Sequence, residues 1–230
     1  WHGAWCWYKV KTLLEAVGQQ VTVVDLPGLG VDTTPPLEVS LASFQARLVE
    51  VLDAAPGPVV LVGHSMGGIA ISAAAEARPA KIAKLVYLSA FLLQSGQSMY
   101  DVASTDTDSL TLPNLLVDPV AGVIDIQRDA IRPIFYEECP DADVTLASAL
   151  LRPTPLGPIG QPLAVSTASF GSVRRFYISC TDDRAVTPAA QQAMVAASPC
   201  EKVFTLDSDH SPFFSRPLPL ASRLLHIAKL

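Results

Sequence analysis

The sequence predicts an α/β protein built on a mostly parallel sheet with helices on both faces. Strand-like and helix-like segments alternate along residues 1–92 and again along 168–230, which is typical of parallel strands joined by crossover helices. The segment 58–63 is apolar throughout, as expected for a strand buried on both faces. Half of the 230 residues are hydrophobic and 17% are charged, which excludes disorder and fits one domain carrying an insertion.

The amino-terminal part predicts a helix, a strand and a second helix. Apolar residues recur with helical spacing along Tyr8–Val17. Gln20–Leu26 is rich in β-branched residues and predicts a strand. The second helix is expected to end near Ala55, with either Ser40 or Ser43 as its cap.

The rest of the scaffold continues this alternation. A buried strand leads into a helix of small residues, and two further strand–helix units close the chain. The expected elements are strands at Pro58–Gly63, Ile82–Leu88, Arg175–Ser179 and Lys202–Leu206, and helices at Gly67–Ala77, Pro188–Ala197 and Leu218–Leu230.

Residues 93–167 are expected to form a helical cap (lid) insert in a core made of residues 1–92 and 168–230. Ten acidic and three basic residues lie within 101–160, so this stretch carries a formal charge of −7 and the remainder +1. Eight of the nineteen prolines fall within 113–162, which predicts short helices and irregular connections without a regular sheet. The simplest interpretation of the charge is a solvated surface, and the alternative is repulsion of anionic substrates from an entrance.

The composition argues against nucleic-acid and membrane partners. The formal net charge is −6, whereas a phosphate backbone attracts clustered positive charge. The apolar run Leu85–Leu93 is too short to cross a bilayer. The four cysteines show no metal-ligand spacing, so we expect reduced thiols in a soluble, cytoplasmic protein without a metal. Association into a homodimer stays open.

The strongest signal for chemistry is Gly63-His64-Ser65-Met66-Gly67, a G-x-S-x-G motif between an expected strand and an expected helix. A serine on such a sharp turn has strained backbone angles, and small neighbours let the chain pass closely. Its hydroxyl lies beside the helix N-terminus, where the Met66 N–H is placed to donate to a developing oxyanion. The alternative is a glycine-rich turn that only packs a helix against the sheet.

A serine nucleophile needs a base, and His210 is the best placed of the four histidines. It follows the expected strand Lys202–Leu206 and precedes the last helix, which is where the order Ser–Asp–His places the base. By contrast, His2 stands at the chain start, His64 adjoins the serine and His226 lies within an amphipathic helix.

The acid that orients the base is expected just after the strand Arg175–Ser179. Asp182 and Asp183 both lie there, and spacing alone does not choose between them. Asp207 and Asp209 are too close to the histidine in sequence for this role and are interpreted as loop-turn residues.

These residues, in this order, resemble the α/β-hydrolase superfamily, and within it the group of plant methylesterases, hydroxynitrile lyases and their bacterial esterase relatives. The resemblance covers nearly the whole chain and implies the α/β-hydrolase fold. In the family pattern the acid lies four residues before the position of Thr187, which implies Asp183. The stretches that carry the resemblance are His2–Lys9, Leu13–Ala16, Val24–Leu26, Gly63–Gly68, Pro140–Ala147, Thr181–Asp183 and Asp209–Ser211.

The resemblance also bears on the first residues. Members of the group carry a strand followed by a doubled His-Gly motif, and His2-Gly3 is similar to the second copy. This implies a first strand and a second oxyanion-hole N–H upstream of Trp1. Loss of one such donor typically lowers the rate by about 10²–10³.

The resemblance implies a serine esterase that hydrolyses small to medium hydrophobic carboxylic esters through an acyl-enzyme. Ser65, His210 and Asp183 would form its triad, and no cofactor is needed. Lyases of the group carry an acidic residue before the serine and a lysine after the catalytic histidine, where this chain has His64 and Ser211. The alternatives are lyase, lactone, amide or C–C bond chemistry, or a non-catalytic ligand-binding protein.

Side chains of the insert are expected to roof a mostly apolar pocket. For any one of them, packing inside the insert is the simpler interpretation. The candidates are Leu115, Leu116, Ile134, Phe135, Tyr136, Leu150 and Leu151.

Overall fold

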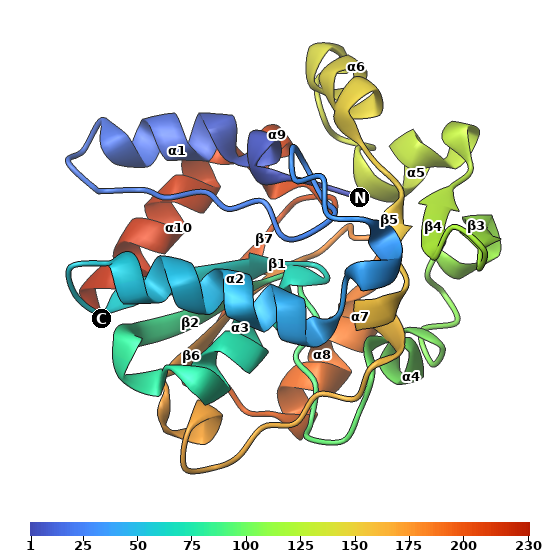
Figure 1. Ribbon diagram of the computed structural model, residues 1–230. Coiled ribbons are helices and arrows are strands. Elements are labelled where there is room, and N and C mark those ends of the chain that lie inside the picture. Colours follow the sequence, from blue (N-terminus) through green and yellow to red (C-terminus); the bar gives the residue numbers. More distant parts are fainter.

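The computed structural model describes residues 1–230, and its centre is a four-stranded parallel sheet (Figure 1). Parallel neighbours need long crossover connections, which the intervening helices provide. The predicted α/β class is therefore confirmed. The strands lie in the order β1 (Val59–His64), β2 (Ile82–Leu88), β6 (Arg175–Cys180) and β7 (Lys202–Leu206).

Helices cover both faces of this sheet. They are α1 (Tyr8–Glu15), α2 (Leu41–Ala54), α3 (Gly67–Ala77), α8 (Pro188–Ala197), α9 (Pro212–Ser215) and α10 (Pro217–Lys229). Successive residues of β2 point to opposite faces, so Leu85 packs with α2 and α3 whereas Val86 packs with α1 and α10. Helix α3 is buried at eight consecutive residues, 68–75. No helix combines the length and the apolar character that a membrane crossing requires.

Helix α2 begins with a capping box that uses both candidate serines. The Ser40 hydroxyl accepts a hydrogen bond from the Ser43 N–H at 3.1 Å, and the Ser43 hydroxyl accepts one from the Ser40 N–H at 2.9 Å. Ser40 therefore occupies the cap position. The remaining short turns are 3₁₀ helices at Ala4–Trp7, Pro36–Glu38, Pro79–Lys81, Leu112–Asn114, Arg128–Ala130 and Phe170–Ser172.

The strand predicted at Gln20–Leu26 does not form. The segment is irregular and pairs with no strand, and β1 is the outermost strand of its sheet. Residues 20–24 and residues 58–63 both line the same cavity, so open space lies between the two segments. Paired strands leave no such space, because their backbones lie only about 4.8 Å apart. β-branched composition does not make a strand where no neighbour lies within hydrogen-bonding range. The first strand expected upstream of Trp1 stays a prediction.

The insert contains the short helices that its prolines predict, but the expectation of no regular sheet was wrong. A three-stranded antiparallel sheet joins β3 (Leu115–Asp118), β4 (Val123–Ile126) and β5 (Thr154–Pro155). Pro155 lies in an edge strand, where its missing N–H is tolerated.

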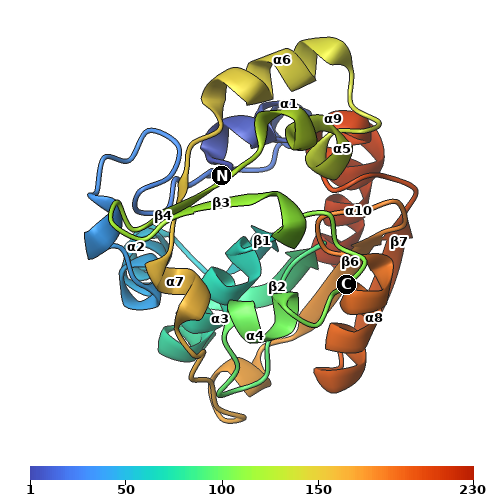
Figure 2. The same ribbon diagram turned by 90° about the vertical axis from the view of Figure 1, so that its right-hand side faces the viewer.

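The cap helices lie with this small sheet at one end of the molecule, on the right-hand side of Figure 1, and Figure 2 shows them from that side. The cap boundaries at residues 93–167 stay a prediction. The helices are α4 (Met99–Ala103), α5 (Ile131–Phe135), α6 (Asp141–Leu150) and α7 (Gly157–Gly160).

Candidate active site

The G-x-S-x-G segment forms the sharp turn between β1 and α3. Ser65 has a φ of +52°, in the left-handed region that is uncommon for residues with a side chain. A Cβ at Gly63 would lie 2.7 Å from the Gly67 carbonyl oxygen, and one at Gly68 would lie 2.2 Å from the Phe91 carbonyl oxygen. Apart from its chain neighbours and the backbone of its own helix, no heavy atom lies within 4 Å of a Cβ built on Gly67. The turn therefore depends sterically on Gly63 and Gly68, and not on the last glycine of the motif.

His210 and Asp183 meet from two loops at the carboxyl ends of adjacent strands. Asp183 follows β6 and His210 follows β7, and such strand ends are where α/β proteins collect their ligand-binding groups. His210 Nδ1 lies 2.7 Å from Asp183 Oδ2, and both residues are almost fully buried. Asp182, the other candidate acid, is exposed and accepts a hydrogen bond from Thr181. The contact at Nδ1 leaves Nε2 of His210 as the nitrogen that can act on a nucleophile.

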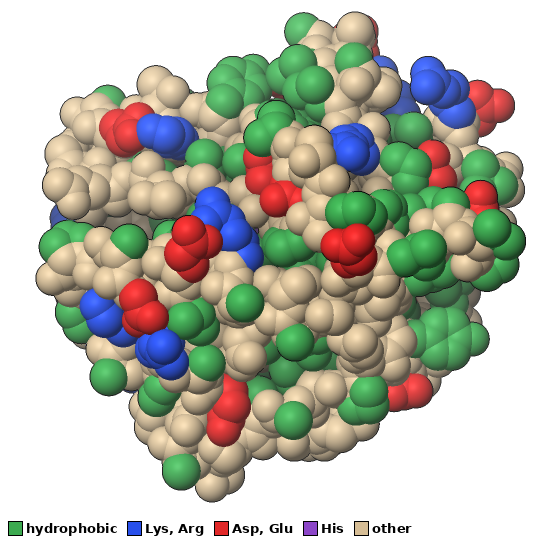
Figure 3. Space-filling model, in the orientation of Figure 1, with side chains coloured by type: hydrophobic (Ala, Val, Ile, Leu, Met, Phe, Trp, Pro, Cys, Tyr) green, Lys and Arg blue, Asp and Glu red, His purple; other side chains and the backbone are tan.

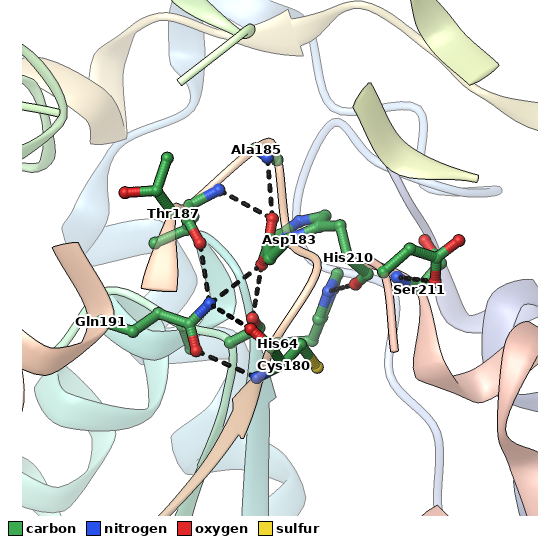
Figure 4. Close-up of polar contacts among 12 residues, drawn as sticks. His64, Cys180, Asp183, Ala185, Thr187, Gln191, His210 and Ser211 are labelled. Carbon is green, nitrogen blue, oxygen red and sulfur yellow. Dashed lines mark hydrogen bonds and ion pairs between the residues drawn. The ribbon is translucent and has the colours of Figure 1, made fainter. Parts of the chain in front are cut away.

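Further donors fix the Asp183 carboxylate, as Figure 4 shows for Ala185 and Gln191. Ser89 has a φ of +43°, and strained backbone of this kind clusters at functional sites. Sequence reasoning missed Ser89, whose one signal is its place directly after β2. Oδ1 accepts from the N–H groups of Ala185 (2.7 Å) and Val186 (2.9 Å), and Oδ2 accepts from the Ser89 hydroxyl (2.5 Å) and Gln191 Nε2 (3.3 Å).

His64, the residue before the serine, binds the backbone of the candidate base. Its Nε2 lies 2.8 Å from the main-chain carbonyl oxygen of His210. Because a carbonyl only accepts, Nε2 carries the hydrogen and donates it. The two imidazole centroids are 4.5 Å apart, and the Phe213 ring meets His64 edge-on at 5.0 Å. The sequence did not indicate this contact.

Desolvation keeps two of the other histidines neutral. Burial is the largest cause that holds the pKa of His64 well below the usual value, and the nearby His210 adds to it. Burial likewise lowers the pKa of His2, with His64 as the next cause. His2 Nε2 lies 2.6 Å from the Tyr136 hydroxyl. His226 is exposed on α10 against the Phe204 ring and does not line the site cavity.

Ser65, Met66 and His210 line one cavity of about 1110 Å³. The cavity reaches from these residues along the free edge of β1 to residues 20–24, so its volume covers more than the site. Its lining is mostly hydrophobic, as substrate pockets usually are. The cap contributes Met99, Ile124, Phe135, Thr154 and Ile159.

Of the seven predicted roof residues, only Phe135 lines the cavity. Its neighbours Ile134 and Tyr136 are buried in the same hydrophobic core as Phe135 but do not line the cavity. Leu116 and Leu150 are exposed. The other two, Leu115 and Leu151, pack against that core.

No three His, Cys, Asp or Glu side chains converge in a way that could hold a metal ion. All four cysteines are free thiols, and burial raises the pKa of each one above its usual value. The chemistry that the geometry supports is therefore that of the serine, the histidine–aspartate pair and the helix N-terminus.

A strained serine between a strand and a helix, with a His–Asp pair opening on the same cavity, is the arrangement of an α/β serine hydrolase. The model of the alpha/beta hydrolase family matches residues 1–223, and the chain belongs to this family.

Its relatives include plant methylesterases. Putative methylesterase 11, chloroplastic, of Arabidopsis thaliana is 38% identical over 99% of this chain and 62% of its own length. Methylesterase 7 of the same species is 36% identical over 99% of this chain and 92% of its own length. Tomato methylketone synthase I, solved with 2-tridecanone, superposes with a TM-score of 0.89 at 29% identity, over 99% of this chain and 94% of that one. The chain spans between about half and two thirds of the length of the first curated relatives it matches.

Proposed function

We propose that this protein is a carboxylic ester hydrolase that acts through an acyl-enzyme on Ser65. The observation that carries the proposal is the 2.7 Å contact between His210 and Asp183, because His210 lines the same cavity as Ser65, which has a φ of +52°. The methylesterase names of the relatives support it.

In the proposed reaction, His210 Nε2 takes the proton of Ser65 as Oγ attacks the ester carbonyl carbon. The Met66 N–H donates to the resulting oxyanion at the start of α3. The bond to the alkoxy group breaks, and the imidazolium returns its proton to that group, which leaves as an alcohol. Water then attacks the acyl carbon with His210 as base, and the carboxylic acid leaves while Ser65 recovers its proton. Asp183 stabilises the imidazolium in both halves.

The proposed substrate is a small to medium hydrophobic ester, and the methylesterase relatives favour a methyl ester. Met99, Ile124 and Phe135 are apolar side chains that line the cavity, and the Phe135 ring centroid lies 5.7 Å from that of His210. Ser211 follows the candidate base and offers no cation for a departing cyanide, which disfavours a lyase.

The proposal includes no nucleic-acid partner. On the face drawn in Figure 3, Lys and Arg side chains are interspersed with Asp and Glu and form no continuous basic patch. A cytoplasmic location and a homodimer stay proposals, and several relatives are named chloroplastic. Imaging of a fluorescent fusion and size-exclusion chromatography test these two points.

The decisive experiment measures hydrolysis of short-chain p-nitrophenyl esters by purified full-length protein, by Ser65→Ala and by Ser222→Ala. Ser222 is exposed on α10, so its substitution controls for serine loss as such. We expect Ser65→Ala to abolish turnover and Ser222→Ala to retain it. Hydrolysis that survives Ser65→Ala would overturn the triad assignment. Tight binding of an aromatic acid without any turnover would favour a non-catalytic binding protein, and cyanide release from a cyanohydrin would favour a lyase.

A further inference from the structure

Asp209, the residue before the candidate base, has a fully buried carboxylate that the proposed reaction does not use. It is 1% exposed and lies in the loop between β7 and α9. Its sequence position suggested an ordinary turn residue, but a buried carboxylate is costly unless donors surround it. Both of its oxygens accept hydrogen bonds, and the two sets of donors come from different parts of the molecule.

One oxygen faces the base loop. Asp209 Oδ1 accepts from the Ser211 N–H at 3.1 Å and from the Ser215 hydroxyl at 2.8 Å. The Ser208 hydroxyl lies 3.5 Å from the same oxygen. The donors come from residues before and after His210 in the sequence. Oδ1 therefore fixes the turn from which the imidazole projects.

The other oxygen faces the cap. Asp209 Oδ2 accepts from the Glu138 N–H at 3.0 Å and from the Cys139 thiol at 3.3 Å. Burial, followed by the charge of Asp209, raises the pKa of Cys139, so the thiol keeps the hydrogen that it donates. A salt bridge of 2.5 Å from Arg216 to Glu138 joins the same two segments.

The cap segment that Asp209 holds also carries a wall of the site. Phe135 lies three residues before Glu138, lines the cavity, and has its ring centroid 5.7 Å from that of His210. Hydrogen bonds to the two oxygens of one carboxylate therefore connect the turn of the base to the segment that bears Phe135.

We propose that Asp209 is a positioning residue that sets the cap wall at Phe135 relative to the imidazole of His210, and thereby sets which acyl groups the site accepts. The inference rests on the proposed esterase function. It assigns Asp209 a role through His210 and Phe135, without contact between Asp209 and the substrate.

The test compares Asp209→Asn with Asp207→Asn. An asparagine amide has one acceptor oxygen, and its NH₂ group can only donate. In either orientation the NH₂ group faces the cap donors or the loop donors, so the hydrogen bonds to one of these two sets are lost. Asp207 is exposed in the same loop and accepts only a 3.3 Å bond from Thr181, which makes it the matched control. The measured quantity is kcat/KM for p-nitrophenyl octanoate divided by kcat/KM for p-nitrophenyl acetate, because an eight-carbon acyl chain contacts more of the cavity wall than an acetyl group does.

We expect Asp209→Asn to change this ratio by roughly tenfold, since misplacement of reacting groups by about 1 Å costs up to about 10²-fold. Asp207→Asn should leave the ratio unchanged. A loss of folded protein lowers both rates equally, so an unchanged ratio in Asp209→Asn would overturn the proposal. Cys139→Ala keeps the carboxylate and removes one of its cap donors, so it should shift the ratio in the same direction as Asp209→Asn.

A crystal structure of the Asp209→Asn protein gives a readout that needs no turnover. The centroid separation of Phe135 and His210 should then exceed 5.7 Å, and an unchanged separation would contradict the proposal. If the wild-type protein hydrolyses neither ester, the esterase proposal fails, while this structural comparison still decides the role of Asp209.

Discussion

The imidazole of His64 donates a hydrogen bond from Nε2 to the main-chain carbonyl oxygen of His210 at 2.8 Å. The nucleophile turn and the base loop lie 146 residues apart in the chain, and this bond joins them directly. The residue that precedes Ser65 therefore helps to determine where His210 stands.

Loss of this bond should lower catalysis more than it lowers stability. We expect His64→Leu to reduce kcat by about tenfold, because one hydrogen bond is worth about 1 kcal/mol and its loss releases the base loop. His64→Gln keeps an N–H donor at a similar reach and should recover most of the rate. Steady-state kinetics on a p-nitrophenyl ester measure this, with His226→Gln as the exposed control. Equal rates in the Leu and wild-type proteins would show that the bond has no catalytic role.

The neutral, half-buried His2 and His64 predict a free energy of unfolding that falls in mild acid. The pKa of His64 and of His2 is low in the folded protein and near 6.5 in the unfolded chain, so below pH 6.5 the unfolded state binds more protons. Unfolding then becomes easier by about 1.4 kcal/mol per pH unit for each such group. Above pH 7 the folded and unfolded states bind equal numbers of protons at these groups, so the pH dependence vanishes.

Urea denaturation between pH 5 and pH 8 measures this slope. In the His64→Gln protein this slope should be smaller by the contribution of one titrating group. A free energy of unfolding that stays constant from pH 7 to pH 5 would contradict the neutral state of these rings.

Substitutions of the adjacent residues Asp182 and Asp183 should have very different effects on kcat. Asp183→Asn should lower kcat by about 10⁴, because an amide opposite Nδ1 favours the wrong imidazole tautomer. Asp182→Asn changes an exposed side chain that contacts Thr181, and its rate should stay within about twofold of wild type. Comparable losses in both variants would mean that His210 uses a different acid from the one it contacts here.

The glycines of the turn should not be equivalent. Gly68→Ala places a methyl group 2.2 Å from the Phe91 carbonyl oxygen and should cost about 1–3 kcal/mol or more of stability. Gly67→Ala meets nothing and begins a helix, so it should leave stability unchanged or raise it by up to about 1 kcal/mol. Thermal unfolding with an activity assay decides this, and a Gly67→Ala protein that unfolds readily would show a constraint other than the missing Cβ space.

The local sequence pattern was sufficient to predict those helices and strands whose own residues determine where they begin and end. Helix α3 and strand β2 begin and end where the sequence predicts, because small or apolar residues run between clear breakers. The segment 20–26 failed because a strand also needs a neighbour. The small sheet in the cap failed for a related reason, since its pairing depends on a turn and an edge position that proline content does not reveal.

The residues of the candidate site likewise fall into those that the sequence pattern identified and those that it did not. Ser65 and His210 follow from motif and order, but spacing could not choose Asp183, and the resemblance to known hydrolases supplied that choice. His64, Ser89 and Asp209 were missed because their partners lie 70 to 146 residues away in the chain. Contacts of that range depend on tertiary packing, and their residue types are also common in loops.

The helix behind Ser65 is enclosed by protein along residues 68–75. Because no face of this part of the helix is exposed to solvent, the helix cannot shift or change its tilt without displacing packed neighbours. In the proposed reaction, the N–H groups at its first turn are therefore in place before the ester binds, and little reorganisation is needed when negative charge develops. The packing around α3 therefore holds the serine turn in place.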